Sequence, residues 1–222
     1  MNESAHGSKP DLKRIRLYLI SDAFPKVQPL ERFLSEAIAG GVDMVQLREK
    51  SLDDKHLLEA ATRCAGFCRQ AGVPFVVNDR VDIALASGAT GVHLGQDDLP
   101  PRAAREIAGA GLFIGLSTHT AQQVDEANTL DVDYIGVGPI HATPTKPGRA
   151  SVGIKLVRYA AQHARVPFFA IGGLDPENVG EAVGAGAEGI SVLRWISQAN
   201  EPQAAAQALL GAIERARSVA TS

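Results

Sequence analysis

Short runs of nearly continuous apolar residues recur along the chain, and a longer amphipathic or alanine-rich stretch follows each of them. Runs of Val, Ile, Leu and Phe without strict alternation are typical of parallel strands that are covered on both faces. We therefore predict eight strands, at Arg16–Ser21, Asp43–Arg48, Pro74–Asn78, Gly91–Leu94, Leu112–Ser117, Tyr134–Gly138, Pro167–Ile171 and Gly189–Leu193.

The stretches between these runs have the composition of helices. Pro29, Pro100 and Pro176 stand near expected helix starts, where the missing N–H of proline costs least. Glycines near the expected ends suit the left-handed backbone that often terminates a helix. The predicted helices include Leu30–Ala39, Asp53–Ala71, Ala121–Leu130, Ile154–Ala164, Asp175–Ala185 and Pro202–Arg217.

An alternation of strands and helices requires right-handed crossovers and a parallel sheet. Eight such units within 222 residues fit a closed barrel better than an open sheet. We therefore predict the α/β class, with a single (β/α)8 TIM barrel and a closed parallel eight-stranded sheet over residues 14–222. Residues 1–13 lack the apolar stretch of a secretory signal, and we expect them to form a disordered tail.

Charge and hydropathy narrow the class of protein. The formal net charge of −3 gives no support to a nucleic-acid or anionic-membrane surface, because either would need a basic excess. No apolar run approaches the ~18 residues needed to span a bilayer. We expect a cytoplasmic protein with small-molecule substrates and with no nucleic-acid or membrane partner. The sequence leaves a homo-oligomer open.

The two cysteines, Cys64 and Cys68, stand four residues apart in a predicted helix. This spacing places both side chains on one face of the helix. Two small buried residues is the favoured interpretation, and a metal-binding pair is the alternative.

Polar residues collect where the predicted strands end, and in such a barrel this is where ligands bind. After the second strand, Gln46, Arg48 and Lys50 share one face, because side chains alternate along a strand. An amide and two cations at the barrel mouth suit phosphate oxygens. The alternative is a solvated strand end that pairs with neighbouring acids.

Carboxylates follow the next two strands. Asn78 and Asp79 end the third strand, and Asp98 follows the fourth. Neighbouring strands lie about 4.8 Å apart, so the two carboxylates would repel unless a cation lay between them. Mg²⁺ prefers one or two carboxylates together with waters and phosphate oxygens, so we predict a Mg²⁺ site here. A pair of helix N-caps is the alternative, and Asp97 suits that role.

The fifth strand ends in Ser117, whose hydroxyl can contact a ligand. His119 follows it near an expected helix cap, where a structural histidine is favoured over an acid or a base. His93 and His141 stand at similar positions, and the sequence gives no partner for either.

The last three strands are followed by threonines, glycines and cations, which suit an oxygen-rich ligand. Phosphate sites in barrels commonly use the loops after strands seven and eight, where backbone N–H groups act as donors. The residues concerned are Thr143, Thr145 and Lys146 after the sixth strand, Gly172 and Gly173 after the seventh, and Leu193 and Arg194 after the eighth.

Seven segments, in order from about Leu17 to Ile196, resemble the thiamine-phosphate synthase family. They are Gln-Leu-Arg-Glu-Lys (46–50), Val-Asn-Asp-Arg (77–80), Gly-Val-His-Leu-Gly-Gln-Asp-Asp-Leu (91–99), Ser-Thr-His-Thr (117–120), Tyr-Ile-Gly-Val-Gly-Pro-Ile (134–140), Thr-Pro-Thr-Lys (143–146) and Ala-Ile-Gly-Gly-Leu (170–174). The resemblance implies a Mg²⁺-dependent transferase that joins a pyrimidine diphosphate, 4-amino-2-methyl-5-(diphosphooxymethyl)pyrimidine, to a thiazole (carboxylate) phosphate. The products would be thiamine phosphate and pyrophosphate.

The resemblance also implies a role for each site residue. Departing diphosphate would be stabilised by Mg²⁺ and by the cations Arg48, Lys50 and Lys146, with Ser117 as a further catalytic candidate. The implied sets are Gln46, Arg48, Lys50, Asn78, Ser117 and Lys146 for the pyrimidine diphosphate, Asp79 and Asp98 for Mg²⁺, and Thr143, Thr145, Gly173, Leu193 and Arg194 for the thiazole phosphate.

Arg194 departs from the family, which usually carries Ser at this position. Backbone donors do not depend on the side chain, so our hypothesis is that Arg194 either adds a charge-assisted contact or swings clear of the ligand. Two other functions remain as alternatives. One is a thiazole tautomerase-like relative, which would lack the metal-diphosphate apparatus, and the other is a non-catalytic sensor of phosphate ligands. The paired aspartates and the Gln-x-Arg-x-Lys strand favour the synthase.

Overall fold

The computed structural model describes residues 10–23, 25, 28–142 and 150–220, and it shows a closed barrel of parallel strands. The strands follow one another in sequence order, and the last closes on the first through the pair Leu17 and Ile190. The predicted α/β class and TIM-barrel architecture are confirmed. The strands are β1 (Leu17–Ser21), β2 (Met44–Leu47), β3 (Phe75–Asn78), β4 (Gly91–Leu94), β5 (Phe113–Thr118), β6 (Tyr134–Val137), β7 (Phe168–Ile171) and β8 (Gly189–Val192).

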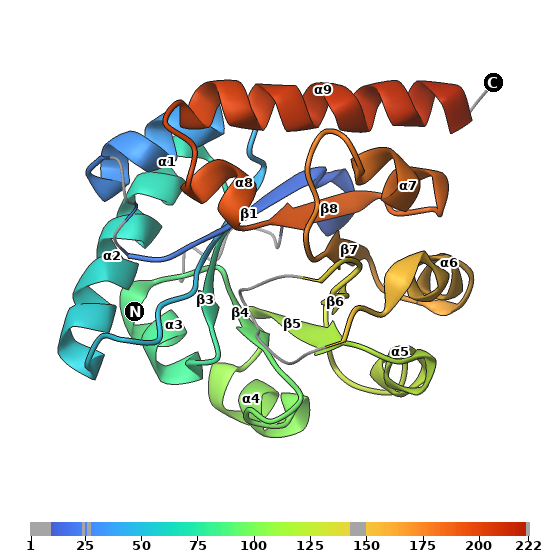
Figure 1. Ribbon diagram of the computed structural model, residues 1–222. Helices are drawn as coiled ribbons and strands as arrows, with labels where there is room; N and C mark the ends of the chain where they lie inside the picture. Colours follow the sequence, from blue (N-terminus) through green and yellow to red (C-terminus); the bar gives the residue numbers. More distant parts are fainter. Residues whose placement is uncertain (1–9, 24, 26–27, 143–149, 221–222) are drawn as a thin grey trace.

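Helices surround the barrel, and the long C-terminal helix α9 lies across α1 and α7 (Figure 1). Their apolar faces pack on the outer side chains of the strands and form the larger of two hydrophobic cores. The helices are α1 (Leu30–Ala39), α2 (Asp54–Ala71), α3 (Val81–Ser87), α4 (Pro101–Ala108), α5 (Ala121–Ala127), α6 (Gly153–His163), α7 (Val179–Gly184), α8 (Arg194–Ser197) and α9 (Pro202–Ala220).

The helices differ from the prediction in three respects. Helix α5 ends at Ala127 and not at Leu130. The short helices α3 and α8 were not among the predicted ranges, whereas α4 begins directly after Pro100, where a helix start was expected. In addition, α7 begins at Val179 and not at Asp175. Oδ1 of Asp175 accepts hydrogen bonds from the backbone N–H groups of Glu177 and Asn178, at 2.9 and 3.0 Å. This side chain holds residues 175–178 in a turn, so the helix starts after it.

The expected N-terminal tail, residues 1–13, lies outside the described residues up to residue 9. Its last part belongs to the barrel. Leu12 begins a short 3-10 helix, Leu12–Arg14, and the side chain of Asp11 accepts a hydrogen bond from the N–H of Lys13. Leu12 and Ile15 are buried against the interior side chains, because they close the end of the barrel at which β1 starts.

Large side chains and glycines alternate inside the barrel. A Cβ atom on Gly91 would overlap the ring of Phe113, and one on Gly115 would overlap the ring of Tyr134. These glycines therefore make room for the aromatic rings that fill the barrel interior below the cavity. The carboxyl-terminal end of the barrel is left free for a cavity. The interior cluster consists of Leu12, Ile15, Tyr18, Met44, Val76, Phe113, Tyr134 and Phe169.

Cys64 and Cys68 are buried in α2 and face the outer core, as the favoured interpretation predicted. Burial raises the pKa of both thiols, which keeps them protonated at neutral pH. Among the described residues, no helix has the length and apolar character that a membrane crossing requires.

Candidate active site

A cavity of about 360 Å³ opens at the carboxyl-terminal end of the barrel. Its walls come from every strand, and apolar side chains such as Ile20 and Ile171 alternate there with polar ones. Seven residues of the ligand sets that the family resemblance implies lie together in its lining: Gln46, Arg48, Asn78, Ser117, Gly173, Leu193 and Arg194. Lys50, Asp79 and Asp98 are not among the lining residues.

Two cations, Arg48 and Lys50, follow the carboxyl end of β2. Gln46 and Arg48 line the cavity, and the N–H of Arg48 extends the strand by donating to the carbonyl of Ser21 at 2.8 Å. Glu49 organises the following loop, since its Oε1 accepts from the N–H groups of Lys50 and Ser51, each at 2.8 Å. Burial opposes ionisation of Glu49, but its hydrogen bonds outweigh this and lower its pKa. These hydrogen bonds fix the backbone of Lys50, two residues beyond the cavity-lining Arg48.

Asp79 lies at the centre of a tight turn directly after β3. The N–H of Arg80 donates to the carbonyl of Asn78 at 2.8 Å, and the N–H of Asp79 donates to the carbonyl of His93 at 2.8 Å. The φ angle of Asp79 is 63°, and among the described residues other than glycine it is the only positive one. A three-residue turn with positive φ is rare and strained, and such strain clusters at functional sites. The turn directs the carboxylate out of the strand.

The carboxylates of Asp79 and Asp98 interact, and the ammonium of Lys50 lies beside them. Nζ of Lys50 is 3.0 Å from Oδ2 of Asp79, and Oδ2 of Asp98 accepts from the N–H of Gly95 at 2.7 Å. Burial and then the Asp98 carboxylate raise the pKa of Asp79, against the opposing effect of Lys50. Two partly desolvated carboxylates that repel each other form a donor set that suits Mg²⁺.

The described residues contain no group of three or more His, Cys, Asp or Glu side chains that could hold a metal. A Mg²⁺ ion keeps several waters and typically takes only one or two carboxylates from the protein, so this finding does not bear on a Mg²⁺ site. A closed zinc-type centre would instead need about four protein ligands.

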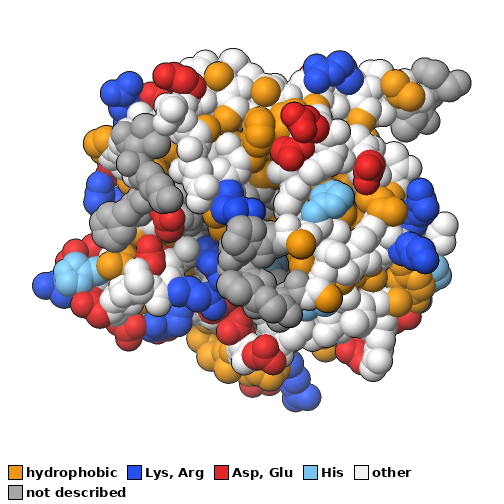
Figure 2. Space-filling view, in the orientation of Figure 1, with side chains coloured by type: hydrophobic (Ala, Val, Ile, Leu, Met, Phe, Trp, Pro, Cys, Tyr) orange, Lys and Arg blue, Asp and Glu red, His pale blue; other side chains and the backbone are white. Residues whose placement is uncertain are grey.

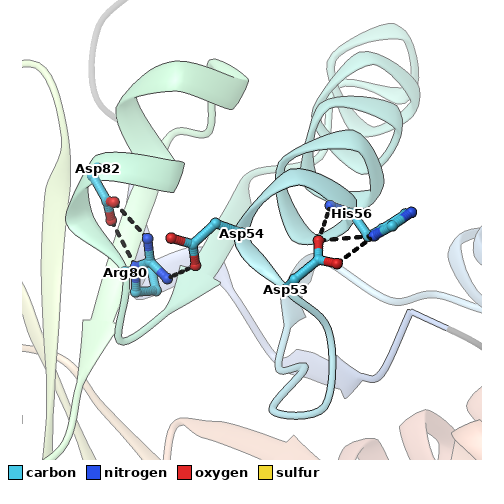
Figure 3. A network of polar contacts seen from close by, with 5 residues as sticks. All are labelled: Asp53, Asp54, His56, Arg80 and Asp82. Carbon is cyan, nitrogen blue, oxygen red and sulfur yellow. Dashed lines mark hydrogen bonds and ion pairs between the residues drawn. The ribbon is translucent and has the colours of Figure 1, made fainter.

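Arg80 ties the Asp79 turn to two neighbouring helices (Figure 3). Its Nη1 donates to Asp54 at the start of α2, at 2.5 Å. Its Nε and Nη2 form a fork with the carboxylate of Asp82 at the start of α3, at 2.9 and 2.6 Å. The fork and the extra ion pair hold the backbone next to Asp79 in place. Beside them, Asp53 caps α2 and accepts from the ring and the N–H of His56 (Figure 3).

Side chains inside the barrel form a hydrogen-bonded chain beneath the cavity. Gln46 donates to the hydroxyl of Tyr18, which lies 3.0 Å from the hydroxyl of Tyr134. The same Tyr134 hydroxyl lies 3.0 Å from Nδ1 of His93, and Nε2 of His93 lies 2.9 Å from Oγ of Ser117. No partner of His93 could be deduced from the sequence, and Tyr134 and Ser117 are among its partners in the structure.

The loops after β6 and β7 are packed closely together. The N–H of His141 donates to the carbonyl of Gly172 at 3.0 Å, and a Cβ atom on Gly172 would lie 2.5 Å from Cα of Pro139. Gly173 has a φ of 64° and would likewise meet His141. Asn178 donates to the carbonyl of Gly173 at 2.8 Å. Only glycine fits these two positions, which leaves backbone at the cavity wall beside Arg194.

Three predicted site residues, Thr143, Thr145 and Lys146, lie outside the described residues.

On the face shown in Figure 2, Lys and Arg side chains gather around the centre with acidic side chains between them. His119 also lines the cavity, and it has a structural contact, since its Nδ1 bonds to the carbonyl of Gly138.

A sequence profile described as thiamine monophosphate synthase matches residues 17–196. The chain belongs to the thiamine monophosphate synthase family. It is 42% identical over 214 residues to a thiamine-phosphate synthase of Nostoc sp., covering 96% of this chain and 60% of that protein. It is 46% identical over 215 residues to a thiamine-phosphate synthase of Mycolicibacterium smegmatis, covering 92% and 95%.

Among solved structures, the thiamine phosphate pyrophosphorylase of Pyrococcus furiosus matches this fold with a TM-score of 0.84 at 30% identity. The match covers 92% of this chain and 98% of that one. The chain spans about 60% of the length of the Nostoc relative, whereas it covers nearly all of the mycobacterial one. The predicted family resemblance is confirmed.

Three residues of the site in this family member were not predicted from the sequence: Arg80, Tyr18 and Tyr134. The strand period could have revealed the two tyrosines, because each stands two residues before a cavity-lining residue on the same strand and so faces the same side. No sequence pattern indicated the role of Arg80, because its partners Asp54 and Asp82 come from the starts of two separate helices.

Proposed function

We propose that this chain is a thiamine-phosphate synthase that joins a pyrimidine diphosphate to a thiazole phosphate with Mg²⁺ as cofactor. One observation carries the proposal: in a member of this family, Lys50, Asp79 and Asp98 form one cluster. Lys50 and Asp79 stand within two residues of Arg48 and Asn78, which line the cavity. Cations beside a carboxylate pair suit a Mg²⁺–diphosphate complex, because each charge on the complex has an opposite charge to meet.

The diphosphate end of the substrate would lie at β2, β3 and β4. Arg48 offers a planar fork to phosphate oxygens, and Lys50 offers a mobile point charge. Asp79 and Asp98 would hold Mg²⁺, which when bound neutralises charge on the diphosphate and so improves it as a leaving group. Asn78 lines the same wall and can donate or accept one further hydrogen bond.

In the proposed reaction, the bond between the methylene carbon and the diphosphate oxygen breaks, and the electron pair leaves with the diphosphate. Arg48 and Lys50 stabilise the charge that develops on the departing group, together with Lys146, which lies outside the described residues. The electron-rich aminopyrimidine carries the resulting cation, and the thiazole nitrogen then attacks it. The reaction needs no protein nucleophile, so orientation and electrostatics supply the rate enhancement.

The thiazole phosphate would lie at the other side of the cavity. The backbone at Gly173, and at Leu193 and Arg194 where β8 passes into α8, borders the cavity there. Barrels commonly bind phosphate at these two loops beside a short extra helix, and α8 is such a helix. Thr143 and Thr145 are proposed to complete this site.

The test is release of pyrophosphate by the purified protein given both substrates. We expect release that requires both substrates and Mg²⁺ together and that stops in EDTA. Asp79→Ala and Lys50→Ala should lose turnover while the far-UV circular dichroism of the barrel is kept. Matched controls are Asp125→Ala and Lys13→Ala, since both residues are exposed and lie outside the cavity lining.

Two results would overturn the proposal. Tautomerisation of a thiazole phosphate without pyrophosphate release would indicate the tautomerase-like function. Tight binding of phosphate ligands with no turnover under any combination of substrates would indicate a sensor.

A further inference from the structure

The interior hydrogen-bonded chain joins two cavity residues that come from opposite parts of the barrel. Gln46 on β2 is connected to Ser117 on β5 through Tyr18 on β1, Tyr134 on β6 and His93 on β4. All five side chains also line the cavity. The chain therefore forms part of the cavity floor.

The direction in which the protons point follows from the orientation of the Gln46 amide and from a count of donors. Tyr18 is 2% exposed and accepts from Nε2 of Gln46, so its own proton needs another acceptor. Among the described residues that acceptor is the Tyr134 hydroxyl, at 3.0 Å. Tyr134 then donates its proton to Nδ1 of His93. A reversed bond between the tyrosines would leave the buried Tyr18 proton unpaired, which is costly.

The same logic fixes the imidazole and the serine. A neutral imidazole has one protonated nitrogen, so His93 with an accepting Nδ1 carries its proton on Nε2. Nε2 donates to Oγ of Ser117, which leaves the serine hydroxyl proton for the cavity. Burial raises the pKa of Tyr18 and of Tyr134, so both phenols keep the protons that this arrangement needs.

The two ends of the chain are thereby coupled. With Nε2 of Gln46 bound to Tyr18, its carbonyl oxygen is the atom left to accept from a ligand, while Ser117 donates. If the Gln46 amide were turned over, every bond of the chain would reverse, and Ser117 would become an acceptor. In either direction one end donates and the other accepts, because the intervening groups each give and take one proton.

We propose that Tyr18, Tyr134 and His93 are positioning residues that make Gln46 a hydrogen-bond acceptor and Ser117 a hydrogen-bond donor toward the cavity. The ligand class that fits is a flat heteroaromatic ring with an N–H donor at one edge and an unprotonated ring nitrogen at another. An aminopyrimidine has both groups, so in this respect the inference rests on the proposed function. The chain itself is a property of the protein without ligand.

The first experiment therefore uses the ligand-free protein. In protein labelled with ¹⁵N-histidine, long-range ¹H–¹⁵N spectra report the tautomer of each of the 6 histidines, and His93→Gln identifies the signals of His93. We expect His93 to be the pure Nε2–H tautomer. Tyr134→Phe should abolish this preference and give averaged nitrogen shifts. Tyr18→Phe should weaken it, because Tyr134 keeps its proton but loses its partner.

The matched control is Tyr159→Phe. Tyr159 is the remaining tyrosine of the chain, and its hydroxyl donates to the exposed Asp125 on the outside of the barrel at 2.7 Å. This variant should leave the His93 signals unchanged. An Nδ1–H tautomer of His93 in the unmodified protein would overturn the proposal, and so would His93 signals that Tyr134→Phe does not alter.

The second experiment measures KM for each substrate. Loss of one net hydrogen bond predicts a KM for the pyrimidine diphosphate about 3- to 10-fold higher in Tyr134→Phe, with the KM for the thiazole phosphate unchanged. Equal changes in both constants would contradict a positioning role. If the protein has no synthase activity at all, the proposed function fails, while the tautomer of His93 still decides the proposal on the chain.

Discussion

Lys50 and Asp79 form an ion pair across two neighbouring loops, with Nζ of Lys50 3.0 Å from Oδ2 of Asp79. The lysine is 58% exposed and the aspartate 24%, so the lysine can reach into solvent while the carboxylate stays against Asp98. An exposed pair of this kind contributes little to stability. Because Asp79 directly follows the cavity-lining Asn78, we expect the pair to serve function rather than stability.

Asp79 should destabilise the folded protein, although we expect it to be needed for turnover. Its φ of 63° is strained for a residue with a Cβ atom, and its carboxylate is held against that of Asp98. Asp79→Gly should therefore raise the free energy of unfolding by about 1 kcal/mol in metal-free buffer while turnover is lost. Urea denaturation in EDTA measures the first effect.

Asp98→Ala is the contrasting variant. It removes the acceptor of the Gly95 N–H and should lower stability by about 1 kcal/mol while also losing turnover. Equal destabilisation by Asp79→Gly and Asp98→Ala would show that the turn at Asp79 is not strained.

Arg80 should act on the metal site without touching it. Arg80→Lys keeps the charge but loses the fork to Asp82 and the contact with Asp54. Supporting partners of metal ligands are typically worth about 10-fold or more in metal affinity, so the Mg²⁺ concentration for half-maximal turnover should rise about tenfold. Electron paramagnetic resonance of Mn²⁺ binding gives an independent readout.

Arg63→Lys is the matched control for Arg80, because Arg63 pairs with Glu31 on the outer helices. Its Mg²⁺ dependence should equal that of the unmodified protein. A normal Mg²⁺ dependence in Arg80→Lys would mean that the turn at Asp79 keeps its conformation without the contacts of Arg80.

Arg194 should strengthen the binding of the thiazole phosphate. The structure places this residue in the cavity lining at the first position of α8, where a guanidinium can reach a phosphate held by the loop. Arg194→Ser, which restores the usual residue of the family, should weaken thiazole phosphate binding about 10- to 100-fold, since charge-assisted hydrogen bonds are worth roughly 1.5–3 kcal/mol. Isothermal titration calorimetry at two salt concentrations checks this. A sharp gain in affinity would show instead that Arg194 obstructs the site.

Gly115 should be intolerant of even one methyl group. A Cβ atom there would overlap the ring of Tyr134, which is surrounded by Phe113 and Phe169. Gly115→Ala should lower the free energy of unfolding by about 1–3 kcal/mol. Gly66→Ala in α2 is the control, because a Cβ atom there meets nothing within 4 Å. This variant should gain up to about 1 kcal/mol of helix stability, and a similar loss in both variants would contradict the packing argument.

The predicted strands agree with the observed ones to within two residues at each end, because an apolar run between polar turns has few other places to go in a parallel sheet. Helix ends were less predictable. At α7 a single side chain, Asp175, decides between turn and helix, and that competition is not visible in a periodic pattern. The helix α8 has only four residues, which is too short for a periodic pattern to show in the sequence.

The candidate site divides in the same way. The two-residue period of a strand predicted that Gln46 and Arg48 would share the cavity wall, and the structure places them there. The positive φ of Asp79 and the fork of Arg80 could not be read from the sequence, since both depend on residues of other elements.

The sequence by itself determined the order of strands and helices, the end of the barrel at which polar residues collect, and the kinds of charge present there. These follow from local periodicity and from the geometry of parallel strands. Only the tertiary structure decided which polar groups meet, as in the pairing of Lys50 with Asp79 and the chain through Tyr18 and Tyr134 to His93. The reason is that barrel closure and strand register set the distances between side chains that are far apart along the chain.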